Sequence, residues 1–476
     1  MGQEIEQTSF GAHEQEKFRA RLRHETKTLK RWFDEQAFEQ SSTPTTGLEL
    51  EAWLTDENLL PAPQNDRFIA IADDARIVPE LSRFNFELNV DPRPLADDFL
   101  RQTRRDLESL WGLCEAAAAA LNLAPVAIGI LPTVRDEMLQ PAWMSESNRY
   151  RALSQELLRL RNHEPLHVLI DGDEQLDLRC NHIMLEAACT SLQAHLQVNQ
   201  DDAVRSYNAS IIAAGPLVAA TANSPFLYGK SLWSETRIPA FEQATAVHGF
   251  RDVTGRDVLR VTLGTDYLRH SMLELFLENL AFPVLLPVLV EQRERLPHLR
   301  LQNGTIWRWV RPILGFNADG QPHLRIEQRV MPAGPSIVDT VANLALSFGL
   351  TLALATEETP PESLIPFEDA RNNFYACSRD GLAATVRWQG RRVGVQTLLH
   401  DELLPRARRA LDERGVSRAD LVECFDDILL PRLQSGRTGS QWQRSYCQCN
   451  GSNFQALTQS YLAWQRSGRP VHDWTV

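Results

Sequence analysis

The chain has 476 residues, of which 43 % are hydrophobic, so it can bury a large core in one large unit or in two to three domains. Its 49 Lys and Arg residues stand against 62 Asp and Glu residues, which gives a formal net charge of −13. A surface of this charge does not suit a polyanion, so nucleic acid is not an expected partner.

The cysteines and the first residues bear on the compartment. Seven cysteines are scattered without zinc-ligand spacing, which favours reduced thiols. We assign no role to the lone pair Cys447 and Cys449. The first ten residues are polar and acidic, and they do not resemble a secretion signal. No uncharged apolar stretch is long enough to cross a bilayer. We therefore expect a cytoplasmic protein without a membrane partner.

Apolar residues at three- and four-residue spacing predict a helix over residues 14–38, and the Ser, Thr and Pro residues at 41–46 separate it from a following strand. The same spacing predicts helices near Asp97–Leu121, Asp201–Ala222, Val338–Ala355 and Asp401–Arg414. Past about residue 360 the pattern changes to a strand pair, 383–388 and 391–395, followed by helices. We expect a mostly helical C-terminal region there.

Four segments alternate between apolar and polar residues with a period of two, as strands with one buried face do: 47–54, 83–90, 191–198 and 323–330. The polar positions are all odd-numbered: Glu49, Glu51, Arg83, Asn85, Glu87, Asn89, Gln193, His195, Gln197, Arg325, Glu327 and Arg329. Gln328 is the exception on the apolar side. The pattern predicts an antiparallel sheet with helices packed on its apolar face.

The composition of the polar face indicates chemistry. A solvated face is the better interpretation for any one strand alone, but these four strands carry Glu, His, Gln, Asn and Arg without a lysine. If they share a sheet, Glu49, Glu51, Glu87 and Glu327 gather on one surface and repel unless cations lie between them. Carboxylates with one imidazole suit Mg²⁺ or Mn²⁺ better than zinc.

Magnesium beside arginines is what phosphoryl transfer from ATP requires. The sequence has no G-x-G-x-x-G pattern, and the segment ending in Gly229, Lys230 and Ser231 has Ser224 where a P-loop needs its first glycine. A nucleotide would therefore bind on the sheet face.

Five segments between residues 47 and 341 carry a family resemblance. They are the G-x-E-x-E strand at 47–51, the acidic pair Glu80 and Glu87, the strand 190–198 with His195, the sequence AATANSPFLYGK at 219–230, and the E-x-R pair at 327–329. In this order they resemble the glutamate–cysteine ligase family of the bacterial and plant type, within the glutamine synthetase-like carboxylate–amine ligases. The region after 360, including 436–442, resembles a proteobacterial subgroup whose amine substrate is less certain.

The resemblance implies an α+β fold with a concave antiparallel β-sheet backed by helices, which binds ATP and Mg²⁺ or Mn²⁺ on its polar face. It implies an N-terminal helix and linker (1–46), a catalytic domain (47–360) and a mostly helical C-terminal subdomain packed on it (361–476). The implied metal ligands are Glu49, Glu51, Glu80, Glu87, His195 and Glu327, with Glu80 on a loop. Glu327 and Arg329 would be catalytic, Arg237, Gln193 and Asn89 would bind substrate, and Gln197 and Arg325 would bind nucleotide.

The implied reaction joins the γ-carboxylate of glutamate to an amine such as cysteine through an acyl phosphate made from ATP. Two alternatives remain open at this stage. One is the same chemistry with another amine or carboxylate, and the other is a non-catalytic member of the fold that binds a ligand. Nothing in the residues favours a monomer over a homo-oligomer.

Overall fold

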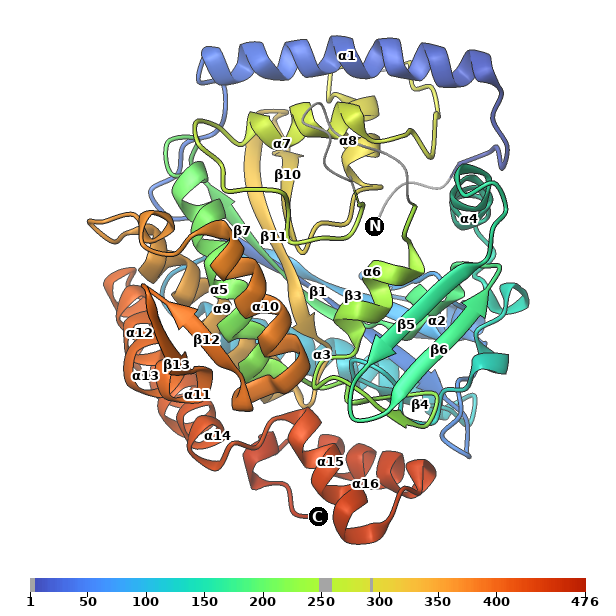
Figure 1. The fold of residues 1–476 in the computed structure, drawn as a ribbon, viewed down its shortest axis with the longest axis vertical. Helices are drawn as coiled ribbons and strands as arrows, with labels where there is room; N and C mark the ends of the chain where they lie inside the picture. Colours follow the sequence, from blue (N-terminus) through green and yellow to red (C-terminus); the bar gives the residue numbers. More distant parts are fainter. Residues whose placement is uncertain (1–4, 248–258, 292–293) are drawn as a thin grey trace.

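The computed structural model describes residues 5–247, 259–291 and 294–476 (Figure 1). Its centre is a seven-stranded antiparallel sheet with the order β10-β11-β7-β1-β3-β2, in which β4 pairs with the end of β1. The strands are β1 (Thr45–Thr55), β2 (Ile77–Pro79), β3 (Asn85–Pro94), β4 (Ala124–Val126), β7 (Ser191–Val198), β10 (Val310–Phe316) and β11 (Pro322–Pro332). All four strands expected from the alternation lie in this sheet, so that prediction is confirmed.

The helices before the C-terminal region are α1 (Ala12–Asp34), α2 (Asn65–Ala72), α3 (Phe99–Ala119), α4 (Asn148–Leu160), α5 (Ala203–Thr221), α6 (Arg237–Ala244), α7 (Leu273–Glu278), α8 (Pro297–Asn303) and α9 (Ile337–Ala355). Those after them are α10 (Phe367–Asp380), α11 (Val395–Leu398), α12 (Leu404–Glu413), α13 (Arg418–Leu421), α14 (Leu430–Ser435), α15 (Gly439–Asn450) and α16 (Phe454–Arg466). Short hairpins are formed by β5 (Leu166–Asp171) with β6 (Gln175–Cys180), β8 (Phe226–Leu227) with β9 (Lys230–Ser231), and β12 (Thr385–Trp388) with β13 (Arg391–Gly394).

The expected helices are present with small differences at their ends. The first helix ends at Asp34 rather than Phe38, and a π-helical turn, Leu399–Leu403, precedes α12. The expected turn between β12 and β13 has positive φ at both Gln389 and Gly390, as a two-residue hairpin requires. The proposed boundaries at residues 46 and 360 stay predictions.

Helices cover the apolar face of the sheet. Leu48, Leu192 and Ile326 belong to the main hydrophobic core together with α5 and α9, and α5 packs against both β11 and α9 (Figure 1). Gln328, the exception in the alternation, points to this side, where its side-chain amide donates a hydrogen bond to the Ser210 carbonyl of α5 (3.0 Å). The helices therefore leave the polar face of the strands open on the other side.

Helix α9 is long and apolar enough to cross a membrane by length and composition alone. Within the fold, however, 83 % of its most apolar stretch is buried, and it packs against α3, α5 and α12. Its apolar surface is therefore covered by protein, as in the core helix of a globular domain.

Candidate active site

The strand register places the predicted polar residues beside one another. Glu51 on β1 lies opposite Glu87 on β3, Glu327 on β11 lies opposite His195 on β7, and Glu49 lies opposite Gln193. Because side chains at paired positions leave the sheet on the same face, these groups converge. The face they form lines a cavity of about 890 Å³.

Glu49, His195 and Glu327 form the first cluster. Their potential ligand atoms lie within 4.8 Å of one another, and His195 Nε2 is 3.3 Å from Glu49 Oε1 and 3.7 Å from Glu327 Oε1. Both ring nitrogens of His195 are buried without a hydrogen-bond partner in the described part of the chain. Buried polar atoms are seldom left unsatisfied, so this histidine fits a cation held between the two carboxylates.

Glu327 is the most strongly held member of this cluster. Burial tends to raise the pKa of its carboxyl group, but the charges of Arg311, Arg329 and His195 outweigh burial and lower that pKa to about 2. Arg311 binds both oxygens of Glu327, with Nε 2.5 Å from Oε2 and NH2 2.8 Å from Oε1. Glu327 is therefore a charged, oriented carboxylate at neutral pH.

Glu51, Glu80 and Glu87 form a second cluster, with ligand atoms also within 4.8 Å of one another. Glu80 follows β2 and lies outside the strand, as expected. Burial and the charge of Glu80 raise the pKa of Glu51 to about 7, and burial with the charges of Glu49 and Glu80 raises the pKa of Glu87 well above its ordinary value. A divalent cation would remove this repulsion, so the donors of both clusters fit Mg²⁺ or Mn²⁺.

Three further contacts orient the second cluster. The Ser191 amide and the Gln193 side chain donate to the two oxygens of Glu51 at 2.6 and 2.9 Å. The Asn89 side-chain amide donates to Glu87 Oε1 at 3.0 Å. Asn89 does not line the cavity. Asn89 therefore positions a cluster carboxylate, and its expected contact with substrate stays a prediction.

Arginines also line the cavity, and Arg329 and Arg311 contact Glu327 of the first cluster. Arg329 lies 3.4 Å from Glu327 Oε2 and also donates to Gln193 Oε1. Arg325 lines the cavity together with Arg295 and Arg300, and burial and the charges of Arg325 and Arg295 lower the pKa of Arg300. Several guanidinium groups this close favour a polyanionic ligand between them.

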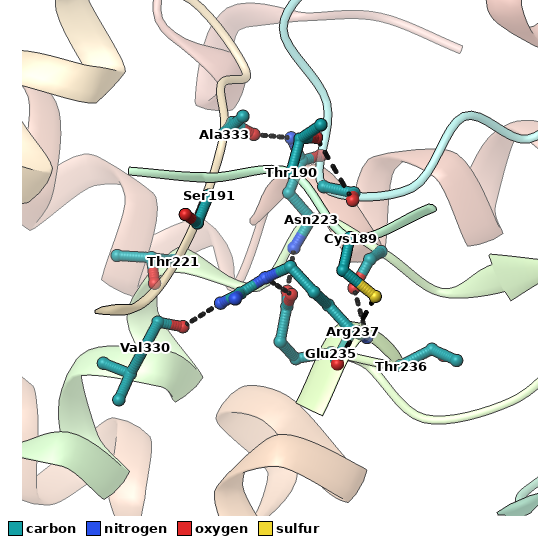
Figure 2. Close-up of polar contacts among 12 residues, drawn as sticks. Cys189, Thr190, Ser191, Thr221, Asn223, Glu235, Thr236, Arg237, Val330 and Ala333 are labelled. Carbon is teal, nitrogen blue, oxygen red and sulfur yellow. Dashed lines mark hydrogen bonds and ion pairs between the residues drawn. The ribbon is translucent and has the colours of Figure 1, made fainter. Parts of the chain in front are cut away.

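Arg237 lies away from the cavity. It is 1 % exposed, and its Nε donates to Glu235 Oε1 (3.1 Å) while NH2 donates to the Val330 carbonyl on β11 (Figure 2). Its NH1 donates to the Arg329 carbonyl (3.3 Å). The guanidinium also stacks 5.3 Å over the Trp309 ring. All three nitrogens are therefore held by the protein, and the predicted contact with a substrate carboxylate is corrected to a contact that ties α6 to the sheet.

Gln197 has a partner within the protein. Its side-chain amide donates to Glu39 Oε2 (2.5 Å), and it is not among the residues that line the cavity. The hydrogen bond joins it to the segment between α1 and β1. The expected contact between Gln197 and a nucleotide stays a prediction.

The sequence interpretation missed several cavity residues, which are Arg311, Arg295, Arg300, Tyr150, Glu186 and Trp307. Arg311 lies on β10, where Pro312 hides the strand alternation. Glu186 lies in a short 3₁₀ turn, Met184–Ala188, and such a turn leaves no periodic signal.

The helix-backed, curled antiparallel sheet with a carboxylate-lined cavity is the fold of the glutamine synthetase-like ligases. One solved structure that shares it is glutamate–cysteine ligase from Francisella tularensis in complex with AMP, with a TM-score of 0.53, 12 % identity and coverage of 90 % of each chain. Another is a bifunctional glutathione synthetase from Pasteurella multocida, with a TM-score of 0.50, 12 % identity and coverage of 92 % of this chain and 54 % of that one. At this identity, the likeness shows the fold alone.

The assignment of this chain to a family comes from its sequence. Residues 45–460 match the model of glutamate-cysteine ligase family 2, so the chain belongs to this family, as the motif resemblance predicts. No curated protein is similar enough in sequence to count as a relative.

Proposed function

We propose that this protein is an ATP-dependent carboxylate–amine ligase that forms a γ-glutamyl amide, with glutamate and cysteine as its substrates. The observation that carries the proposal is the strand register, which gathers two separate carboxylate clusters and several arginines around one cavity. Membership of glutamate-cysteine ligase family 2 supports the ligase class and the choice of substrates. The AMP in the Francisella tularensis structure supports an adenine nucleotide as the phosphoryl donor.

Each part of the cavity has a task in this reaction. The first cluster and the second would hold Mg²⁺ or Mn²⁺, which neutralises phosphate charge and brings nucleotide and carboxylate together. Arg329, fixed between Glu327 and Gln193, would stabilise the transferred phosphoryl group. Arg325, Arg300 and Arg295 would bind the rest of the triphosphate.

The glutamate γ-carboxylate attacks the γ-phosphorus of ATP and releases ADP, and the amine then displaces phosphate from the acyl phosphate. The protein's main contribution is to position the reactants and to keep water from the acyl phosphate. With these substrates the enzyme would act in glutathione biosynthesis, and we place it in the cytoplasm, where thiols stay reduced. Another amine or carboxylate, or a non-catalytic binding role, is the alternative that the experiment must separate.

The experiment measures ADP release with Mg²⁺, ATP, glutamate and a panel of amines. ADP should form only with glutamate and a suitable amine, and no release with any pair would refute the ligase proposal. A calorimetric titration of Mg²⁺ with a non-hydrolysable ATP analogue tests the site itself. Glu49→Gln and Glu327→Gln should each weaken metal-dependent nucleotide binding at least about 10-fold, since each removes a charged ligand, whereas Glu16→Gln on the exposed side of α1 should not.

A further inference from the structure

One carboxylate of the cavity belongs to neither cation cluster. Glu186 lines the cavity, but no hydrogen bond or ion pair engages its side chain within the described residues, and the ligand-atom clusters leave it out. Burial and the charges of Glu80 and Glu51 raise the pKa of Glu186 well above its ordinary value. Glu186 is half-buried, and a carboxylate that faces a cavity without a protein partner can be neutralised by a cation from outside.

Apolar side chains line the same cavity as this carboxylate. Leu81, Leu153 and Ile183 line the cavity and belong to one hydrophobic cluster, against which Tyr150 also packs. Burial and the charges of Glu80, Glu87 and Glu186 raise the pKa of Tyr150, so its hydroxyl stays protonated and lies within the electrostatic reach of all three. The acidic part of the cavity therefore offers one free carboxylate, one phenol and an aliphatic wall.

A third metal ion is a poorer occupant than an organic cation. A divalent ion needs several oxygen ligands at short distance, and Glu186 has no two other acidic or imidazole groups close enough to share one within the described residues. A primary ammonium group needs only one carboxylate and a few hydrogen bonds. The aliphatic wall also suits an organic side chain better than a hydrated ion.

We propose that Glu186 receives the ammonium group of the amine co-substrate, while Tyr150, Leu81, Leu153 and Ile183 contact its compact, uncharged side chain. This inference rests on the proposed ligase function and specifies its amine subsite. In the ligation step the ammonium gives one proton to the Glu186 carboxylate, and its nitrogen lone pair forms the C–N bond at the acyl carbon. The C–O bond to phosphate breaks, phosphate leaves with that electron pair, and the second proton leaves with it as the amide forms.

Hydroxylamine separates this role from a role in metal binding or acyl phosphate formation. It is largely uncharged at neutral pH, so it can capture the acyl phosphate as a hydroxamate without a carboxylate to bind an ammonium group. For Glu186→Gln we expect kcat/KM for cysteine to fall about 10- to 100-fold, because a charge-assisted hydrogen bond is lost. The rate of hydroxamate formation and metal-dependent nucleotide binding should stay within about 2-fold of the wild type.

Two variants complete the test. Glu186→Asp keeps the charge and should recover part of the activity with cysteine, and the matched control Glu146→Gln, on the exposed loop before α4, should leave every rate unchanged. An equal loss of hydroxamate formation and cysteine ligation in Glu186→Gln would overturn the inference, and so would an unchanged kcat/KM for cysteine. If the wild type itself forms no hydroxamate from glutamate, the proposed function fails, and that failure is visible before any variant is compared.

Discussion

At the scale of single residues, Arg311 gives the clearest contact between an arginine and a cluster carboxylate in the site. Its guanidinium binds both oxygens of Glu327, and a lysine cannot reproduce this planar, two-point contact. We expect Arg311→Lys to lower kcat/KM for ATP about 10- to 100-fold, as the loss of roughly 1.5–3 kcal/mol of charge-assisted hydrogen bonding implies. Steady-state kinetics measures this, with the exposed Arg392→Lys on β13 as the control. Equal kinetics in the two variants would contradict it.

A second prediction at this scale concerns pH and stability. Glu242 on α6 accepts hydrogen bonds from Trp309 (2.8 Å) and Tyr375 (2.9 Å), but burial raises its pKa from 4.5 to about 7. Because folding raises the pKa, the folded state binds the Glu242 proton more tightly than the unfolded state does. The resulting contribution to the free energy of unfolding is fully present below pH 4.5 and is lost as pH rises through 7. The loss amounts to at most about 3 kcal/mol, since each pKa unit corresponds to 1.36 kcal/mol.

We therefore expect Glu242→Gln to remove this part of the pH dependence. The glutamine still accepts both hydrogen bonds but cannot ionise, so the variant should gain stability relative to the wild type at pH 8 and not at pH 5. Urea unfolding at the two pH values checks this. The same change in unfolding free energy with pH in both proteins would show that the pKa of Glu242 is not raised on folding.

Residue patterns predicted much of the site, but not all of it. The alternation of β1, β3, β7 and β11 identified Glu49, Glu51, Glu87, His195 and Glu327, because a period of two determines which side chains share a face. The same argument could not find Glu186, whose position depends on how a 3₁₀ turn folds over the sheet. The role of Arg237 came from the family resemblance, which does not reveal that Glu235 and two carbonyls already bind its guanidinium.

At the scale of elements, helix α1 packs against the α8 region, which lines part of the cavity. Glu25 of α1 is 2 % exposed, lies 2.5 Å from His298 Nδ1, and accepts a hydrogen bond from the Leu299 amide of α8 (2.8 Å). Other residues of the α8 region, Arg295, Pro297 and Arg300, line the cavity. The contact thus links an N-terminal helix to the arginines of the site.

We expect Glu25→Ala to lower the free energy of unfolding by about 3 kcal/mol, because it leaves His298 Nδ1 and the Leu299 amide buried without a partner. Nucleotide affinity should fall as well, since the α8 region loses its support. Chemical denaturation and calorimetry measure the two effects, and Glu16→Ala on the exposed side of the same helix should change neither. Lower stability with unchanged nucleotide affinity would mean that α1 does not position the arginines.

The order of the strands is the element-level feature that the sequence could not supply. Alternation shows that four strands have a polar face, but it does not say that β7 lies between β11 and β1. The irregular register between Gln328 and Met331 is also invisible beforehand, because a bulge depends on the partner strand. β10 lies at an edge of the sheet, where a proline such as Pro312 is tolerated.

At the scale of the whole molecule, Asn223 in the segment AATANSPFLYGK joins the C-terminal helices to the sheet. Its side-chain amide donates to the Ala333 carbonyl and to the Tyr461 hydroxyl, both at 2.8 Å, and its oxygen accepts from Gln443 (3.0 Å). Tyr461 in turn donates to the Ala127 carbonyl after β4 (2.9 Å). One buried asparagine thereby connects α5, the end of β11, and helices α15 and α16.

Gly439, the first residue of α15, is the position that makes this junction possible, because a Cβ there would overlap Asn223 Oδ1. We expect Gly439→Ala to lower the free energy of unfolding by about 3 kcal/mol, the upper range for overpacking a buried site. Asn223→Ala should cost a similar amount through its lost hydrogen bonds. In the double variant the added methyl group meets no oxygen. Its loss of unfolding free energy should therefore be smaller, by at least about 1 kcal/mol, than the sum of the losses in the two single variants.

Urea unfolding of the wild type, the two single variants and the double variant measures this coupling, and the proposed metal-dependent nucleotide binding gives a second readout at the cavity. If residues 361–476 unfold with the sheet, both readouts should lose the folded state at the same urea concentration in every variant. Additive costs would show that Gly439 and Asn223 do not act through one contact. An earlier transition in the C-terminal helices, with nucleotide binding retained, would instead mean that the junction holds a separate unit whose loss the site tolerates.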